Sequence, residues 1–204
     1  MFGDPICLPE VLFPPTGDVI ILHAVWDSRI KTDGTRRRRL CGNGSKRAAP
    51  QLYLIPQLNS ASSLEHPIQR LFFALCAAEN FLCFSGDATD AFAHAPAPKS
   101  YLWVDEAIAA WILKRWGKRV PRNMVIAIYM ALQGHPEAGA IWERLIKKVL
   151  KELGFESTTH ERNIYQATIQ GKKYLLIRQT DDFCLGCRSA EEAETIFNMI
   201  GDKL

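Results

Sequence analysis

The chain has 204 residues, of which 48% are hydrophobic and 23% are charged, and these are ordinary values for a globular protein with one large core or two lobes. No apolar stretch reaches the ~20 residues needed to cross a bilayer, and the N-terminus lacks the pattern of a signal peptide. We therefore expect an intracellular protein, cytoplasmic or nuclear, that is neither secreted nor inserted in a membrane.

The net charge of +3 is small, but the basic residues are unevenly distributed. Between Arg29 and Arg47 the only acidic residue is Asp33. Such a block indicates either a solvated or disordered segment, or a surface that binds a polyanion; a nuclear import signal is a further alternative. The basic residues of the block are Arg29, Lys31, Arg36, Arg37, Arg38, Arg39, Lys46 and Arg47.

The first part of the chain is predicted to contain a β-hairpin. Residues 1–18 include several prolines and are expected to form a poorly ordered lead-in. Two strands are predicted at about 19–31 and 36–41, because a turn containing Asp33-Gly34 separates them. Residues 42–61, rich in Gly, Ser, Asn and Pro, are expected to form a loop.

The rest of the chain alternates predicted helices and strands, which favours an α+β fold with a mixed or antiparallel sheet. A first helix is expected from a capping box at Ser62–Glu65 to about residue 79. The apolar run 81–87 is predicted to be a short buried strand that ends on Asp87. The later elements are strands at 101–103 and 124–132, a helix at 105–116, a long helix between Gly134 and Gly154, two strands that turn at Gly171-Lys172, and a last helix with a capping box at Ser189–Glu192.

The six cysteines lie mostly inside apolar segments, which indicates reduced thiols rather than a disulfide framework. Cys184 and Cys187 have the spacing of half a zinc site. In a strand, however, an odd spacing places two side chains on opposite faces, and the sequence contains no second pair. We therefore do not expect a zinc site.

Two adjacent carboxylates, Asp181 and Asp182, interrupt the apolar run "YLLIRQTDDFCLGC" between two predicted strands. They are either a polar hairpin turn or part of a site that uses negative charge. Asp87 favours the second alternative, because it also ends an apolar strand, and three gathered carboxylates are stable only with cations. Their hard oxygen atoms suit two Mg²⁺ ions, or Mn²⁺, in phosphoryl transfer chemistry.

Five segments in order make the chain from about Trp26 to Asp202 resemble the reverse transcriptase domain of Ty1/copia-type retrotransposons. These segments are "VWDSRIKTDGTRRRRLC", "HPIQRLFFALCAAEN", "GDATDAFAHA", "ALQGHPEAGAIWERL" and "TDDFCLG". The resemblance implies a palm-like antiparallel sheet packed on helices, at 62–204, and a small basic β subdomain like the polymerase fingers, at 19–61. The implied activity is RNA-directed DNA synthesis by two-metal nucleotidyl transfer to a primer 3′-hydroxyl, and the implied partners are an RNA or DNA template-primer and deoxynucleoside triphosphates.

The resemblance also implies roles for individual residues. Asp87, Asp181 and Asp182 would be the catalytic metal ligands, with Asp182 the weaker one. Asp90 would lie near the nucleotide pocket or make only a local cap or turn bond, and Phe92 would exclude a 2′-hydroxyl or be a core aromatic. The full nucleotide-binding assignment is Lys31, Arg37, Arg39, Asp90, Ala91, Phe92, Gln133 and Gly134. Template phosphates are assigned to Arg36, Arg38, Lys46 and Arg47, although the sequence does not determine which alternate arginines face the site.

The resemblance covers the fingers and palm but no thumb and no ribonuclease H domain, so we expect a fragment of a longer polyprotein. Whether the isolated chain is an active enzyme is left open. The alternatives are a catalytically inactive remnant of a retroelement that at most binds nucleic acid, and, less favoured, a two-metal nuclease that uses the same acids.

Overall fold

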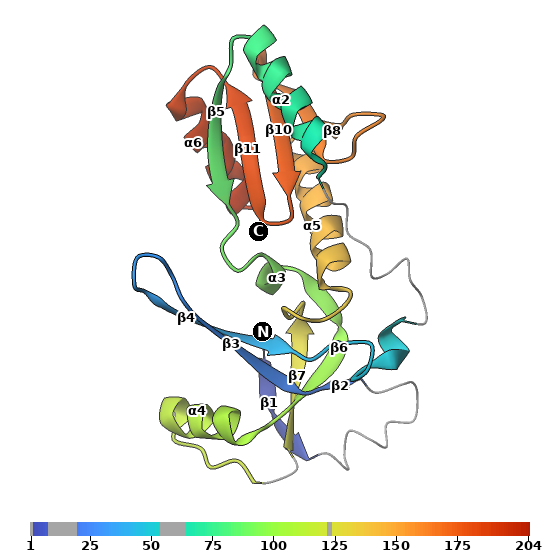
Figure 1. The fold of residues 1–204 in the computed structure, drawn as a ribbon, viewed down its shortest axis with the longest axis vertical. Helices are drawn as coiled ribbons and strands as arrows, with labels where there is room; N and C mark the ends of the chain where they lie inside the picture. Colours follow the sequence, from blue (N-terminus) through green and yellow to red (C-terminus); the bar gives the residue numbers. More distant parts are fainter. Residues whose placement is uncertain (1, 8–19, 54–63, 122–123) are drawn as a thin grey trace. The chain divides into compact units, whose positions relative to one another are not determined.

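The computed structural model describes residues 2–7, 20–53, 64–121 and 124–204 (Figure 1). It divides into two compact units. The first unit comprises residues 1–60 and 92–141, and the second comprises residues 61–91 and 142–204. The described residues have an α+β fold whose strands pair mainly antiparallel.

This division differs from the predicted boundary at residues 61 and 62. Residues 92–141 belong with the N-terminal part of the chain, because their strands pair with strands near the N-terminus. The predicted lead-in also contains a strand, β1 (Phe2–Cys7), which pairs with β7 (Met124–Met130). The remaining residues of that lead-in lie outside the described part of the chain.

The first unit contains a four-stranded sheet in the order β1-β7-β6-β2, in which β6 is Pro96–Trp103 and β2 is Ile21–Leu22. Only β2 and β6 pair in parallel among these strands. Helix α4 (Glu106–Trp116) contributes buried Ile108 and Ile112 to the core beside this sheet. The predicted strand at 124–132 and helix at 105–116 are thus confirmed in their main parts.

The basic segment forms the predicted hairpin, from β3 (Ala24–Ile30) and β4 (Arg36–Gly42). Its turn contains Gly34, whose φ of 80° lies in the left-handed region that glycine adopts without steric cost. A short 3₁₀ helix, η1 (Pro50–Tyr53), follows, and the Tyr53 hydroxyl donates a hydrogen bond of 2.9 Å to the Gly44 carbonyl. This bond ties the segment after the hairpin back to the end of β4.

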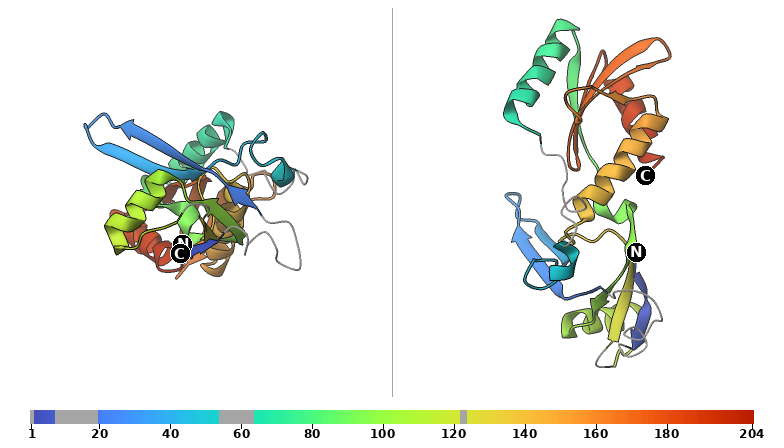
Figure 2. Two further views of the ribbon diagram at one scale, coloured as in Figure 1. Left: turned by 90° about the horizontal axis from the view of Figure 1, so that it is seen from below. Right: turned by 90° about the vertical axis from the view of Figure 1, so that its right-hand side faces the viewer.

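The second unit contains a five-stranded antiparallel sheet in the order β5-β11-β10-β9-β8. Figure 2 (right) shows α2 (His66–Ala78) on one side of this sheet and α5 (Ala138–Glu152) with α6 (Ala190–Gly201) on the other. The strands are β5 (Leu82–Asp87), β11 (Asp182–Cys187), β10 (Lys172–Gln179), β9 (Ile164–Ile169) and β8 (Glu156–Ser157).

Strand β5 was expected to be buried, and this prediction is wrong. The strand lies at the edge of the sheet, and Leu82 is 58% exposed. On one side of the strand Gly86 leaves room for Phe197 of α6, because an added Cβ would lie 3.0 Å from the Phe197 ring. An apolar run therefore formed an edge strand with one open face.

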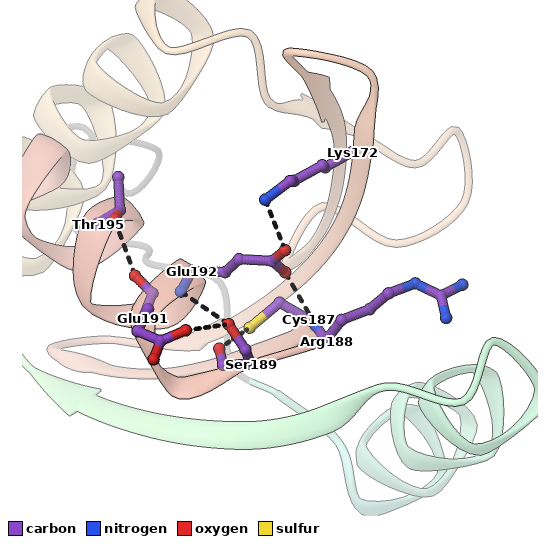
Figure 3. A network of polar contacts seen from close by, with 7 residues as sticks. All are labelled: Lys172, Cys187, Arg188, Ser189, Glu191, Glu192 and Thr195. Carbon is purple, nitrogen blue, oxygen red and sulfur yellow. Dashed lines mark hydrogen bonds and ion pairs between the residues drawn. The ribbon is translucent and has the colours of Figure 1, made fainter.

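The Ser189 cap predicted at the start of α6 is confirmed, but the return bond from Glu192 goes to the residue before the cap instead of to the cap itself (Figure 3). The Glu192 backbone N–H donates to Ser189 Oγ (3.3 Å), while Glu192 Oε2 accepts from the Arg188 N–H (3.0 Å). Lys172 Nζ also lies 2.9 Å from Glu192 Oε1, and these partners lower the pKa of Glu192, with the Lys172 bond the largest cause. The glutamate thus fastens the start of α6 to β10.

The start of α2 differs from the prediction. Its N-cap residue is Glu65, which makes no side-chain cap hydrogen bond, and Pro67 lies in the first turn. The predicted cap residue, Ser62, lies outside the described residues. A separate finding is that no helix in the described part of the chain combines the length and apolar character needed to cross a membrane.

Candidate active site

Three carboxylates that are far apart in the sequence meet at one end of the second unit's sheet. Strands β5 and β11 pair antiparallel, and their register sets Asp87 directly opposite Asp182. The Ala88 backbone N–H donates a hydrogen bond of 2.9 Å to the Asp181 carbonyl. Figure 1 shows β5 beside the β10–β11 hairpin that carries the other two acids. The structure therefore brings Asp87, Asp181 and Asp182 to the same strand ends.

The sequence suggested that both adjacent aspartates lie in the turn, and this prediction is wrong for Asp182. The loop contains only Thr180 and Asp181, while Asp182 is the first residue of β11 and pairs with Gln179. Thr180 has a φ of 55°, which is unusual for a β-branched residue. Two-residue hairpin loops commonly require such left-handed conformations, so the tight connection explains the strained threonine.

The carboxylates influence one another electrostatically. The pKa of Asp182 is raised, first by partial desolvation and then by the negative charges of Asp181 and Asp87. A nearby cation would remove this repulsion and favour the ionised form. Among the described residues, however, no three His, Cys, Asp or Glu side chains form a ready metal-binding group. The carboxylates are close enough to interact, without converging into a finished ligand set.

Two side chains donate hydrogen bonds to the backbone of the turn, from the face of the sheet opposite Asp182. Trp142 Nε1 donates a hydrogen bond of 2.7 Å to the Thr180 carbonyl, and Arg178 Nη1 donates to the same oxygen at 3.2 Å. Arg178 is only 2% exposed, and its Nη2 donates to Asn163 Oδ1 at 3.3 Å. Two donors on one carbonyl hold the residue that immediately precedes the aspartates.

Sequence reasoning missed the role of these supporting residues. Neither Trp142 nor Arg178 was among the residues that the sequence predicted for the site. The available signal was an arginine two residues before a loop in an otherwise apolar strand, since a buried arginine needs nearby acceptors. The identity of those acceptors, Asn163 and the Thr180 carbonyl, depends on tertiary structure.

The basic residues assigned to nucleotide or template binding lie in the first unit. The hairpin register pairs Arg37 with Arg29 and Arg39 with Asp27 on one face. It pairs Arg36 with Ile30 and Arg38 with Ser28 on the other face, so the two alternate sets proposed from the sequence do face opposite ways. Lys31, Lys46 and Arg47 are also exposed in this unit.

Gln133 and Gly134 pack against the base of the same hairpin. The Gly42 backbone N–H donates to the Gln133 carbonyl at 2.8 Å. Gly134 has a φ of 86°, and a Cβ there would collide with the Gly42 carbonyl oxygen. The glycine was expected to allow close approach to a nucleotide; the close approach found here is to the chain's own hairpin.

The segment after Asp87 crosses from one unit to the other. Asp90 is exposed and has a φ of 53°, a left-handed conformation that aspartate tolerates. Ala91 is buried at the start of α3 (Ala91–His94), and Phe92 is half-buried. Asp90 and Ala91 belong to the second unit with the three carboxylates, and Phe92 belongs to the first.

Comparison with protein-family models gave no match to this chain, and no curated protein matches it significantly.

Proposed function

We propose that the chain is the reverse transcriptase domain of a Ty1/copia-type retrotransposon, an RNA-directed DNA polymerase by descent. The observation that carries the proposal is the register of β5 and β11, which sets Asp87 opposite Asp182 and next to Asp181. A metal-dependent polymerase site needs such acids from separate segments, because each ion requires several hard oxygen ligands. Without a cation, the same arrangement is electrostatically unfavourable.

The donor set fits Mg²⁺ or Mn²⁺ in its chemistry, since carboxylate oxygens are the ligands these ions prefer. Asp87 and Asp181 would be the principal ligands and Asp182 the supporting one. Bound ions would supply charge stabilisation for an in-line attack of a primer 3′-hydroxyl on a nucleoside triphosphate. The protein's own contribution is positional: Trp142 and Arg178 hold the turn, and the β5 ladder holds Asp87.

The architecture supports the same proposal at a coarser level. The second unit would be the palm-like part, because an antiparallel sheet covered by helices carries the acids at one end of its strands. The basic hairpin of the first unit would be the fingers-like part, which contacts triphosphate and template. The nucleotide roles of Lys31, Asp90 and Phe92, with those of the other assigned residues, remain predictions of this proposal.

Primer extension tests the proposal directly. The chain is incubated with poly(rA)/oligo(dT), dTTP and Mg²⁺ or Mn²⁺, and single-nucleotide addition is compared between wild type and Asp181→Asn. We expect measurable addition by wild type and a loss of at least about a hundredfold in the variant, since the change removes a charged metal ligand.

Two other results of the primer-extension test would count against the proposal. Equal addition by both proteins would reject the assignment of Asp181. No addition by either, with salt-sensitive RNA binding retained, would favour the inactive remnant over the polymerase. Asp202→Asn serves as the matched control, because Asp202 is an exposed carboxylate of the same unit at the end of α6.

A further inference from the structure

Three thiols of the second unit gather on one face of its sheet. Cys83 lies on the edge strand β5, Cys184 on the neighbouring strand β11, and Cys76 on helix α2. The Cys83 side chain is hydrogen-bonded to both other thiols. All three cysteines are free: Cys83 is exposed, Cys184 is half-buried, and Cys76 is only 1% exposed. The cluster therefore joins a thiol that solvent reaches to one that solvent does not reach.

The register of β5 and β11 determines where these thiols lie. Cys83 pairs with Gly186. Cys184 pairs with Ser85, two positions along, so the two cysteines are diagonal neighbours on the same face of the sheet. Cys76 Sγ lies over Gly186, because a Cβ built on this glycine would be 2.5 Å from the sulfur atom. The helix thus brings its thiol to the residue directly opposite Cys83.

Backbone spacing distinguishes the two disulfides that Cys83 could form. Diagonal neighbours in an antiparallel pair lie about 7–8 Å apart, whereas a disulfide usually joins Cα atoms about 4.4–6.8 Å apart. A bond between Cys83 and Cys184 would therefore require one of the two strands to move. Cys76 is free of this restriction, because it comes from a helix and not from a paired strand. Three thiols could instead hold a metal ion, but within residues 64–121 and 124–204 no such group is found.

We propose that Cys76 and Cys83 are a redox pair, which hydrogen peroxide oxidises to an intramolecular disulfide. The Cys83 sulfur attacks one peroxide oxygen, the O–O bond breaks, and the sulfenic acid of Cys83 forms with release of one water molecule. The Cys76 sulfur then attacks the Cys83 sulfur, the S–O bond breaks, and a second water molecule leaves with the Cys76 proton. The two thiols lose two electrons, and the peroxide gains them.

Burial determines the order of the two steps. It raises the pKa of Cys76 to about 12, with the charge of Cys83 as the next cause, so Cys76 stays protonated at neutral pH. Peroxide reacts with the thiolate and has to reach it from solvent, so the exposed Cys83 reacts first. Formation of the sulfenic acid removes the Cys83 charge, and with it one cause of the raised pKa of Cys76.

The disulfide would fasten the last part of α2 to the first part of β5, the edge strand that ends on Asp87. Oxidation would thus add a covalent link to a strand that is otherwise paired with β11 alone among the described strands. The inference concerns thiols and requires neither metal nor nucleotide. It therefore fails or holds independently of the proposed polymerase activity.

The test treats the reduced whole chain with hydrogen peroxide, alkylates the remaining thiols, and digests the product with a protease that cleaves after glutamate. Glu79 lies between the two cysteines, so Cys76 falls in the peptide 66–79 and Cys83 in the peptide 80–106. Mass spectrometry should find these two peptides joined by a disulfide. The peptide 162–191, which contains the cysteines of β11, should remain alkylated and unlinked.

Two variants test the roles of the individual thiols. Cys76→Ser should leave the sulfenic acid of Cys83 without a partner, so that dimedone labels the peptide 80–106. Cys187→Ser is the matched control, since Cys187 is a buried thiol of the same unit on the opposite face of the sheet. Its Sγ donates a hydrogen bond of 3.3 Å to the Ser189 carbonyl (Figure 3). This control should form the disulfide between Cys76 and Cys83 as wild type does.

The same oxidation in urea shows whether the fold selects the pair. Without the fold, Cys184 and Cys187 close a shorter loop than Cys76 and Cys83, so their disulfide should become the main product. Persistence of the link between peptides 66–79 and 80–106 as the main product in urea would overturn the inference. So would a link from Cys83 to the peptide 162–191 in the folded chain, or a lack of dimedone labelling in Cys76→Ser.

Discussion

Replacing Trp142 with alanine is expected to lower the free energy of unfolding by about 3–5 kcal/mol, the usual cost of truncating a large buried aromatic residue. The Trp142 side chain is fully buried, with 0% exposure. It also donates the 2.7 Å hydrogen bond to the Thr180 carbonyl, so its loss removes both core packing and a support of the turn. The effect would be measured by urea unfolding followed by circular dichroism.

Trp142→Phe separates the two contributions. Phenylalanine keeps most of the apolar volume and removes the indole N–H, while Arg178 Nη1 remains as a donor to the Thr180 carbonyl. This variant should lose only about 1–2 kcal/mol. Equal losses in the two variants would show that packing contributes little. A loss below about 1 kcal/mol in Trp142→Ala would contradict the role of this residue altogether.

Replacing Gly134 with alanine is expected to cost about 3 kcal/mol or more. A left-handed conformation costs a non-glycine residue about 1–2 kcal/mol, and Gly134 has a φ of 86°. The added Cβ would in addition collide with the Gly42 carbonyl oxygen, a backbone atom that cannot rotate away. The clash would separate residue 134 from the base of the basic hairpin.

Gly117→Ala is the matched control for this substitution. Gly117 lies in the same unit and has a φ of 67°, but a Cβ there would meet no atom within 4 Å. The control should lose only the conformational cost, about 1 kcal/mol. Urea unfolding of both variants gives the difference. Equal losses of unfolding free energy in the two variants would mean that the close contact between Gly134 and Gly42 contributes nothing to the cost of the Gly134 substitution.

Sequence patterns predicted the locally encoded elements well. The hairpin at β3 and β4, the long helix after Gly134 and the cap at Ser189 each follow from signals within a few residues: a turn glycine, an apolar stripe or a capping box. The alternation of the four arginines was also predictable. Because strand periodicity is two, the paired faces could be stated before the hairpin register was known.

Features that depend on distant parts of the chain were not predictable. The exposure of Leu82 follows from the position of β5 at the sheet edge, which its apolar sequence does not encode. The pairing of β1 with β7 moves residues 92–141 into the first unit, and no local pattern reports such a pairing. Strand β1 also contains Pro5, a residue that normally argues against a strand.

The candidate site depends partly on local sequence signals and partly on pairing between distant parts of the chain. The type of residue and its place at a strand end identified Asp87, Asp181 and Asp182 from the sequence. The assignment of Asp182 to β11 and its register opposite Asp87 depend on non-local backbone pairing. The role of the buried Arg178 beneath the turn could not be predicted for the same reason, since its acceptor Asn163 comes from a separate segment.

The most direct test of the central claim is a titration of the chain with Mn²⁺, with the free ion followed by electron paramagnetic resonance. We expect wild type and Asp202→Asn to bind the ion alike, and Asp87→Asn to bind at least about tenfold more weakly, because it removes one of the hard anionic ligands. Equal Mn²⁺ binding by wild type and Asp87→Asn would contradict the account.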